Sequence, residues 1–581
     1  MTTRRLLVWL AAAAVGSLLL LLGPAEGATA APARTLLGPD LAVTAVSAPV
    51  QVLTGRAFTV DATTTELTGG TGASASLTAS ANGVVLATVS VVVPAGVSVV
   101  TTLPVTLPAA GAVRIDVTIT AADPADSELA NNVRSATIDV TDFQVVPSTA
   151  VGPSLAGYGG QFNENVYAAI SRAAGVSDDN LKWMEQSVLG LHPQFSRIFF
   201  AQAALSDPDM MASFVRTVLL AQRAGTTINV TWQGGTLDVK SGTVQKFAEV
   251  LVKLVVKWHV THLRWVTLQN EPNSTKITLA QYENQYRELD PYLANIRGQV
   301  RFMGGDLVQT NQRAWFEYLG AHMTDILDAY SIHVFWDYWD VQKLQDRLTE
   351  VRAIVDGLPE AQRKPLYVTE YGVRGLRTFN GAPAGDPGVW LDGTPITETN
   401  VSAFEHAWFD ILSSRLGYSG TSKWDTYFGR YDKGVQAYYM IGSPDRGWPK
   451  HPMYNLFYLM TATVKPGWHA VELDAVPGTT RLVTAYTGGW DWTLVGLDTA
   501  GAQLNGASTV QVPYSIGGLP PSQAFRLVVW NDVGDGLDGP PTTVTTDAAG
   551  TATFTVPQQG VFTLTTRPGT VEPRNTLPLP D

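Results

Sequence analysis

Cysteine is absent from the 581 residues of the chain. Disulfide bonds therefore stabilise nothing here, and thiolate catalysis and thiolate metal sites are excluded. The eight histidines are scattered, without the His-Glu-x-x-His spacing of zinc hydrolases. We therefore expect no metal ion and no other cofactor.

Basic residues are fewer than acidic ones, 39 against 51, which gives a net charge of −12. No basic cluster stands out, so a nucleic-acid partner is not expected. After residue 22 the chain also lacks any apolar run long enough to cross a bilayer. Tryptophan is plentiful, with 16 residues, and its flat ring suits contact with sugar rings. Oligomeric state is not indicated.

The N-terminus has the pattern of a signal peptide over residues 1–30. Arg4 and Arg5 supply the positive charge, residues 6–22 are apolar, and Ala28-Thr29-Ala30 is a small-x-small cleavage site. We predict cleavage after Ala30 and secretion, with cleavage after Ala33 or an uncleaved membrane anchor as the alternatives. The export route is left open.

The length predicts several domains, since single cores stop growing at about 250–300 residues. Residues 31–142 alternate polar and apolar positions, and Asn82-Gly83 lies between two apolar runs as in a β-hairpin. We predict an Ig-like β-sandwich there. Its segment 126–132 reads Asp-Ser-Glu-Leu-Ala-Asn-Asn, which resembles a motif of adhesion-type CARDB domains. The resemblance implies an accessory spacer or binder, and a simple turn at the Asn-Asn pair is the alternative.

Residues 143–464 change to a repeated order of strand, loop and helix. Eight apolar runs are strand candidates, which suits one (β/α)₈ TIM barrel. They are 155–158, 195–200, 228–232, 263–268, 301–304, 329–334, 366–369 and 421–427. A doubly wound open sheet is the competing fold, but Gly157-Tyr158-Gly159-Gly160 lacks the spacing of its phosphate-binding turn.

Residues 465–570 return to strands, at 481–486, 492–497, 525–530 and 551–556. We predict a second β-sandwich that packs directly on the barrel, because almost no linker follows the last predicted barrel helix. The proline-rich tail, residues 571–581, is predicted to be disordered. The expected fold is thus multidomain, with a central TIM barrel between two β-sandwiches.

Two of the predicted barrel strands end in a glutamate. The run 265–269 stops at Asn270-Glu271-Pro272, because proline cannot donate a ladder hydrogen bond. The run 366–369 ends in Glu370, with a glycine soon after. Barrel enzymes keep their catalytic groups at the C-terminal ends of the strands. A pair of carboxylates at that position is what most glycosidases use to hydrolyse a glycosidic bond.

These two motifs resemble the fourth and seventh strands of glycoside hydrolase clan A, and the strand order places them fourth and seventh independently. The following β-sandwich is similar to that of families 30 and 39, and family 5 shares the barrel. The resemblance implies that Glu271 is the general acid/base, that Glu370 is the nucleophile, and that anomeric configuration is retained.

Electrostatics agrees with these two roles. Two carboxylates about 5 Å apart repel by about 3 kcal/mol at an effective dielectric of about 20, so one proton should stay between them near neutral pH. We expect that proton on Glu271, with Glu370 ionised. Two unrelated strand-end glutamates are the alternative.

The resemblance also implies substrate-binding or supporting roles for further residues. Asn270 would bond the sugar 2-hydroxyl, Arg197 would lie beneath the nucleophile, and His333 would belong to the site. The alternatives are that Asn270 only forms a turn, that Arg197 is a buried structural arginine, and that His333 is a core histidine. The usual His-x-Tyr is His333-Val334-Phe335 here. The tyrosine that contacts the nucleophile is therefore unassigned, with Tyr338 and Tyr371 as candidates.

Tryptophans close to strand ends complete the predicted site. Trp424 matches the clan's eighth-strand aromatic, a floor for the sugar ring. Trp232 ends the third strand and Trp336 follows the sixth, and core packing is the alternative for both. After the first strand, Gln161, Asn163 and Glu164 are further candidates for contact with sugar hydroxyls.

The sequence therefore predicts a secreted, retaining β-glycosidase that acts on a β-linked poly- or oligosaccharide. One rival is a non-catalytic carbohydrate-binding or adhesion protein on a glycosidase-like barrel, which would bind glycan without hydrolysing it. A second rival is a structural surface protein, which would do neither. The sequence does not identify the sugar, and it does not decide between endo and exo action.

Overall fold

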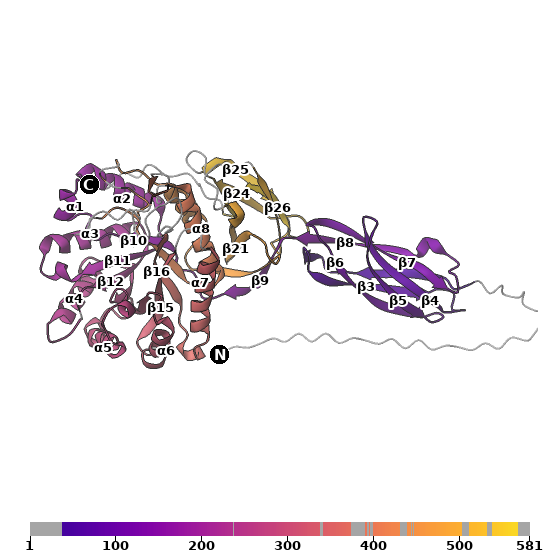
Figure 1. The fold of residues 1–581 in the computed structure, drawn as a ribbon, viewed down its shortest axis with the longest axis horizontal. Coiled ribbons are helices and arrows are strands. Elements are labelled where there is room, and N and C mark those ends of the chain that lie inside the picture. Colours follow the sequence, from indigo (N-terminus) through magenta and orange to yellow (C-terminus); the bar gives the residue numbers. More distant parts are fainter. Residues whose placement is uncertain are drawn as a thin grey trace, which may run out of the picture.

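The computed structural model describes residues 38–567, except 236, 337–340, 374–389, 392–393, 396–398, 430–438, 443, 445–446, 502–509 and 532–536. The predicted signal peptide and the predicted disordered tail lie outside these residues. Within them, no helix is long and apolar enough to cross a membrane. Figure 1 shows three bodies in a row, with a sheet-rich body between the barrel and the N-terminal sheets.

A closed barrel of eight parallel strands forms the largest body, as predicted. It closes because the last strand pairs with both the first and the seventh. The strands are β10 (Gly157–Phe162), β11 (Phe195–Ala201), β12 (Thr227–Gln233), β13 (Leu263–Leu268), β14 (Arg301–Leu307), β15 (Leu327–Trp336), β16 (Leu366–Val373) and β19 (Gly420–Lys423). The two glutamate motifs follow β13 and fall within β16, the fourth and seventh barrel strands.

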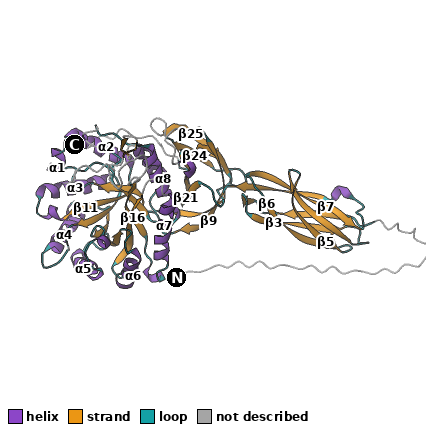
Figure 2. Cartoon of the chain, in the orientation of Figure 1, coloured by secondary structure: helices purple, strands orange, loops and turns teal. Residues whose placement is uncertain are grey.

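Helices surround the barrel (Figure 2). They are α1 (Ala169–Ala173), α2 (Asp178–Leu191), α3 (Pro208–Arg223), α4 (Thr243–Val252), α5 (Leu279–Leu289), α6 (Gln312–His322), α7 (Val341–Asp356), α8 (Asn400–Arg415) and α9 (Pro452–Thr463). The start of α3 illustrates the local chemistry. Asp207 caps it by accepting from the backbone N–H groups of Asp209 and Met210, and Pro208 occupies the first turn, where its missing N–H costs nothing.

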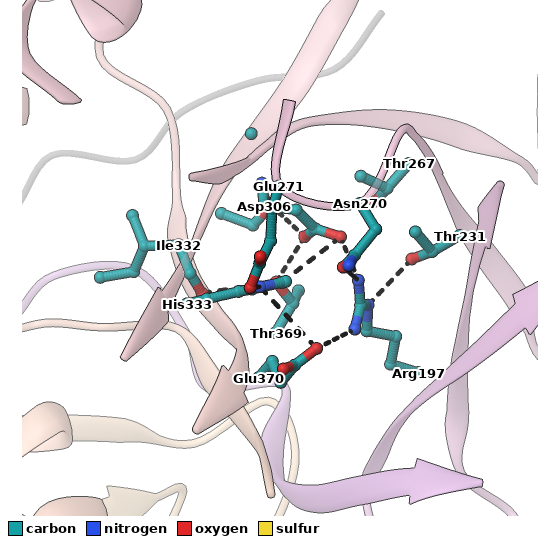
Figure 3. Close-up of polar contacts among 12 residues, drawn as sticks. Arg197, Thr231, Thr267, Asn270, Glu271, Asp306, Ile332, His333, Thr369 and Glu370 are labelled. Carbon is teal, nitrogen blue, oxygen red and sulfur yellow. Dashed lines mark hydrogen bonds and ion pairs between the residues drawn. The ribbon is translucent and has the colours of Figure 1, made fainter. Parts of the chain in front are cut away.

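The inside of the barrel is apolar at one end and polar at the other. Five buried side chains from five different strands form the apolar layer: Phe195, Trp265, Met303, Ala329 and Tyr367. Toward the C-terminal ends of the strands, the buried inward residues are polar and contact one another (Figure 3). This layer holds the predicted site.

A nine-stranded sheet packs against the barrel. Its order is β25-β24-β27-β22-β21-β20-β9-β23-β26. The strands are β9 (Phe143–Val151), β20 (His469–Ala475), β21 (Arg481–Gly488), β22 (Asp491–Asp498), β23 (Gln511–Gly517), β24 (Ala524–Trp530), β25 (Leu537–Thr545), β26 (Ala552–Pro557) and β27 (Val561–Thr565). Phe554 on β26 lies 5.0 Å from Phe562 on β27, between ring centroids, although five strands separate β26 from β27 in the sheet. The sheet therefore curls around its own core.

One boundary differs from the prediction. We placed the start of the barrel domain at residue 143, but Phe143–Val151 pairs with β20 and β23 in the nine-stranded sheet. An isolated apolar strand gives no sequence signal of the sheet it joins. The chain thus crosses this sheet before it enters the barrel, and both ends of the barrel segment are anchored in one body.

The N-terminal part has two sheets around one apolar core. One contains β1 (Leu41–Ser47), β3 (Ala57–Glu66) and β6 (Ser98–Thr106); the other contains β2 (Gln51–Leu53), β8 (Val133–Thr141), β7 (Gly111–Asp123), β4 (Ala73–Ala81) and β5 (Val84–Val93). The Gln51 amide donates to the carbonyl of Ala549 and the hydroxyl of Thr551, each at 2.7 Å, which ties this part to the nine-stranded sheet. Classification of both flanking bodies as β-sandwiches remains a prediction.

Candidate active site

Glu271 lies in a tight turn directly after β13. Gln269 and Glu271 both have left-handed backbone conformations, with φ of 68° and 52°. Non-glycine residues seldom adopt this conformation, and they concentrate at functional sites. The turn leads into a single 3₁₀ turn, Pro272–Ser274. The Glu271 side chain is 30% exposed, so it can reach both the barrel interior and solvent.

Glu370 is held by an irregularity in β16. Ile332 pairs with Val368, but the next pair is His333 with Glu370, so one extra residue is inserted. Such bulges re-aim side chains next to active sites. Here both Thr369 and Glu370 reach the polar interior, where the Glu370 carboxylate accepts from Arg197 at 2.7 Å. A side-chain oxygen of Glu271 and one of Glu370 lie within 4.8 Å of each other.

Arg197 on β11 links the two glutamate tips. Its guanidinium is fully buried and donates from all three nitrogens (Figure 3). The five acceptors are Glu370 Oε2 at 2.7 Å, Asn270 Oδ1 at 2.6 Å, Asp306 Oδ2 at 2.6 Å, Gln161 Oε1 at 3.1 Å and Thr231 Oγ1 at 3.1 Å. Since a guanidinium has five N–H donors in a fixed plane, this set fixes Asn270 and Glu370 relative to each other.

His333 on β15 lies between acidic groups. Its Nδ1 is 3.0 Å from Glu271 Oε1 and 3.8 Å from Glu370 Oε2, while its Nε2 is 3.5 Å from Asp306 Oδ2. The ring is completely buried. His333 therefore contacts the predicted acid/base directly, and the prediction that it belongs to the site agrees with this geometry.

The charges of these groups set their protonation. Burial lowers the pKa of His333, but Glu370 and Asp306 raise it more, and the net pKa is about 9. Burial raises the pKa of Glu271, yet the hydrogen bond and charge of His333 bring it below the ordinary value. We predicted the shared proton on Glu271. These two shifts favour His333 instead as the holder of that proton in the free site, because the imidazole is surrounded by carboxylates.

Glu370 has the opposite shift. Burial raises its pKa, and the charges of His333 and Arg197 reverse only part of that shift, while Glu271 adds to it. The ion pair with Arg197 agrees with the predicted support of the carboxylate. Burial outweighs the effect of Arg197 on the pKa of Glu370, because the side chain is only 9% exposed and loses most of its hydration.

Three side chains of the site could in principle offer ligands to a metal ion. Glu271, His333 and Glu370 each offer one ligand atom, and these lie within 4.8 Å of one another. However, Arg197 places a positive charge 2.7 Å from the Glu370 oxygen. A second cation beside a buried guanidinium is opposed by repulsion, so the donor set does not fit a metal ion well.

The predicted aromatic residues divide into two groups. Trp424 follows β19 and packs edge-on against Phe199, with 5.8 Å between ring centroids, and the Phe199 ring in turn lies 4.3 Å from the Arg197 guanidinium carbon. Trp424 therefore belongs to the surroundings of the site. The backbone of Trp336 ends β15, but its side chain lies outside the described part of the chain, as does Tyr338.

Trp232 does not line the site, contrary to our prediction. Its side chain is fully buried and stacks on Phe200, with the ring of Phe247 from α4 also in contact. The neighbouring Thr231 faces Arg197 inside the barrel. Successive residues of a strand point to opposite faces, so Trp232 faces the surrounding helices.

Tyr371 is also excluded as the tyrosine that contacts the nucleophile. Its hydroxyl donates to Asp410 on α8 at 2.8 Å, and its ring stacks on Phe409 of the same helix. Because Glu370 points inward, the next residue points to the helix layer. Of the candidates after the first strand, Gln161 reaches the site through Arg197, whereas Asn163 is buried and donates to the carbonyl of Tyr427.

Asp306 on β14 is the site residue that sequence reasoning missed. It is fully buried, and its carboxylate also accepts from the hydroxyl groups of Ser331, at 2.8 Å, and Thr369. Burial would raise its pKa, but Arg197 and His333 hold it far below the usual range. The sequence does contain a signal, since the run 301–306 also ends in an acid. We had ended that strand at Gly304.

Comparison with known proteins gives matches of structure alone. No family model and no curated protein matches the chain. A glycoside hydrolase family 30 endoxylanase from Clostridium papyrosolvens C71 matches with 15% identity and a TM-score of 0.50, covering 73% of this chain and 99% of that chain. An endo-β1,6-glucanase matches with 10% identity and a TM-score of 0.50, covering 75% and 96%. These likenesses confirm that the fold resembles that of clan A glycosidases, as predicted.

A further likeness concerns the N-terminal part of the chain. A CARDB domain from Pyrococcus furiosus matches with 24% identity and a TM-score of 0.16, and it covers 18% of this chain and 88% of that chain.

Proposed function

We propose that the chain is a secreted, retaining glycosidase that hydrolyses β-linked poly- or oligosaccharides. One observation carries the proposal: carboxylate oxygens from the tips of the fourth and seventh barrel strands lie within 4.8 Å. Retaining enzymes keep their carboxyl groups about 5–5.5 Å apart, whereas inverting enzymes need about 6.5–9.5 Å to fit a water molecule. The geometry supports the former.

In the first step, Glu370 attacks the anomeric carbon and Glu271 donates a proton to the glycosidic oxygen. The carbon–oxygen bond breaks, the alcohol leaves, and a glycosyl ester forms on Glu370. In the second step, Glu271 takes a proton from water, the hydroxide attacks the same carbon, and the ester bond breaks. Two inversions give net retention.

The supporting residues fit this sequence. Arg197 holds the Glu370 carboxylate and the Asn270 side-chain oxygen in one rigid set. Asn270 is thereby held next to Arg197 and one residue before Glu271, where we propose that it meets the sugar 2-hydroxyl. Trp424 is proposed as the platform for the sugar ring, since a pyranose face stacks on indole by dispersion and burial.

The substrate is proposed only as a class. The two matched enzymes act on different polymers, xylan and β1,6-glucan, so the shared fold does not choose between them. The decisive experiment measures reducing-sugar release from β-glucans, xylans, mannans and galactans. We expect release from at least one of them by the wild-type chain and none by Glu370→Gln.

A matched control keeps this experiment interpretable. Glu360 is exposed and lies in a 3₁₀ turn away from the site, so Glu360→Gln should hydrolyse as the wild type does. Glycan binding without release by the wild type, or equal release by Glu370→Gln, would contradict the proposal and favour the non-catalytic rival.

A further inference from the structure

A carboxylate lies near each ring nitrogen of the histidine at the site. Nδ1 of His333 is 3.0 Å from Glu271 Oε1, and Nε2 is 3.5 Å from Asp306 Oδ2 (Figure 3). The ring is fully buried, while the Glu271 side chain is 30% exposed. Asp306, His333 and Glu271 thus form a chain of polar contacts that runs from the barrel interior toward its open end.

Asp306 cannot easily turn away from this chain. Its Oδ2 accepts from Arg197 at 2.6 Å, and its Oδ1 accepts from Ser331 and Thr369. Its backbone N–H donates to the Ser331 hydroxyl at 2.7 Å, and its own φ is 53°. The preceding Gly305 packs closely against β15, because a Cβ there would meet the Ser331 carbonyl oxygen at 2.2 Å. The carboxylate is therefore a fixed reference for the ring.

We propose that His333 stores the proton that Glu271 uses as the general acid, and that Asp306 is the positioning residue that holds the ring for this transfer. The inference rests on the proposed function, and it adds where the proton waits between turnovers. In the free site the pair is imidazolium and carboxylate. During catalysis it becomes imidazole and carboxylic acid.

The transfer balances in protons and charge. The Nδ1–H bond of His333 breaks, an O–H bond forms on Glu271, and the pair stays neutral overall. Asp306 faces Nε2, so it favours the tautomer that keeps a proton on that nitrogen and leaves Nδ1 free to accept. When water returns its proton to Glu271 in the second step, the proton can go back to Nδ1 and the store is refilled.

Substrate binding supplies the reason for the transfer. Glu271 is a stable carboxylate only while water and His333 solvate it, and a sugar that covers its exposed part removes the water. Loss of solvation disfavours the charged pair. Glu370 and Asp306 favour the charged His333 ring, whereas burial and Arg197 oppose it. Glu271, whose Oε1 lies 3.0 Å from Nδ1, also faces the ring and is stabilised as a carboxylate by it.

The test is the pH dependence of kcat/KM for a substrate with a poor leaving group. Wild-type activity should persist until the stored proton is lost, near the His333 pKa of about 9. In His333→Gln only the Glu271 carboxyl can hold the proton. The basic limb should then move to lower pH by on the order of 2 units or more. Asp306→Asn should move it in the same direction by less.

Two controls separate this role from a structural one. An activated aryl glycoside needs no proton in the first step, so its kcat/KM should show no such shift in either variant. His322 is exposed on α6, and His322→Gln should leave both profiles unchanged. Equal losses on both substrates without a shift of the limb would overturn the proposal.

A titration of the wild-type chain tests the proposal even if the variants fail to fold. With ¹⁵N-labelled histidine, one of the eight histidines should titrate near pH 9, and its pKa should fall in Glu271→Gln. Titration of His333 near its ordinary 6.5 would also overturn the proposal. If Glu370→Gln keeps full turnover, the proposed function itself is wrong. If Glu370→Gln is inactive but the basic limb of kcat/KM does not move in His333→Gln, only the proposal that His333 stores the proton is wrong.

Discussion

The fourth and seventh strand tips carry the same residue type in different surroundings. Glu271 is 30% exposed, lies in a strained turn and contacts a histidine; Glu370 is 9% exposed, lies on a bulged strand and contacts an arginine. The permanently charged Arg197 favours a carboxylate that stays ionised and attacks carbon. The histidine can give and take a proton, which favours a carboxyl group that does the same. Environment, rather than residue type, distinguishes the two proposed roles.

The largest expected effect comes from removing the proposed nucleophile. Glu370→Gln should abolish turnover of every substrate, including activated aryl glycosides, because no ester can form on the amide. Steady-state kinetics on an aryl glycoside measures this, with Glu360→Gln as the matched control. Residual turnover close to that of the wild type would mean that Glu370 is not the nucleophile and that the proposed difference between the two strand tips is wrong.

Removing the acid/base should give a smaller effect that depends on the leaving group. Glu271→Gln should slow substrates with poor leaving groups by roughly 10²–10⁴-fold, while an activated aryl group still leaves. The ester should then accumulate, because Glu271 is also the base that activates water. Added azide, which needs no base, should release a β-glycosyl azide. Equal loss on both substrate classes would break the comparison.

The acid limb of activity tests the burial of Glu370. The nucleophile must be ionised, and its folded-state pKa is raised by burial. As the pH decreases, activity on an aryl glycoside should therefore begin to fall at a pH above 4.5, the ordinary pKa of a glutamate side chain. In Glu271→Gln the limb should move to lower pH, because the charge of Glu271 contributes to the raised pKa. A limb that moves upward in this variant would contradict the account.

The smallest effect on chemistry is expected at Trp232. Trp232→Phe leaves a gap against Phe200 and Phe247 and loses the indole hydrogen bond to Gly235. We expect a loss of about 1–3 kcal/mol of stability, read as a lower midpoint of thermal unfolding. kcat/KM should change little. A large change in KM with an unchanged midpoint would place this tryptophan in the site after all.

Sequence patterns predicted the elements better than the directions of their side chains. All eight barrel strands were located, because a buried parallel strand is a short apolar run. The first was placed early, at 155–158, since Gly159 and Gly160 give no apolar signal. The direction of Trp232 could have been predicted, because the neighbouring Thr231 is the polar, inward residue on a strand whose apolar side chains face the helices.

Other features depend on irregular backbone and could not be predicted. The bulge that turns both Thr369 and Glu370 inward has no sequence signature. The left-handed conformations of Glu271 and Asp306 arise from the tertiary contacts that hold them. The proposed location of the proton rests on the contact between His333 and Glu271, which joins residues from two different strand ends and is not visible in the sequence.

The central claim is that Glu370 attacks carbon and Glu271 handles the proton. Mass spectrometry of the enzyme trapped with a slow mechanism-based glycoside tests it most directly. After digestion, the sugar should be attached to the peptide that contains Glu370, and proton NMR of the released product should show the β configuration. Sugar on the peptide that contains Glu271, or a product of inverted configuration, would contradict the account.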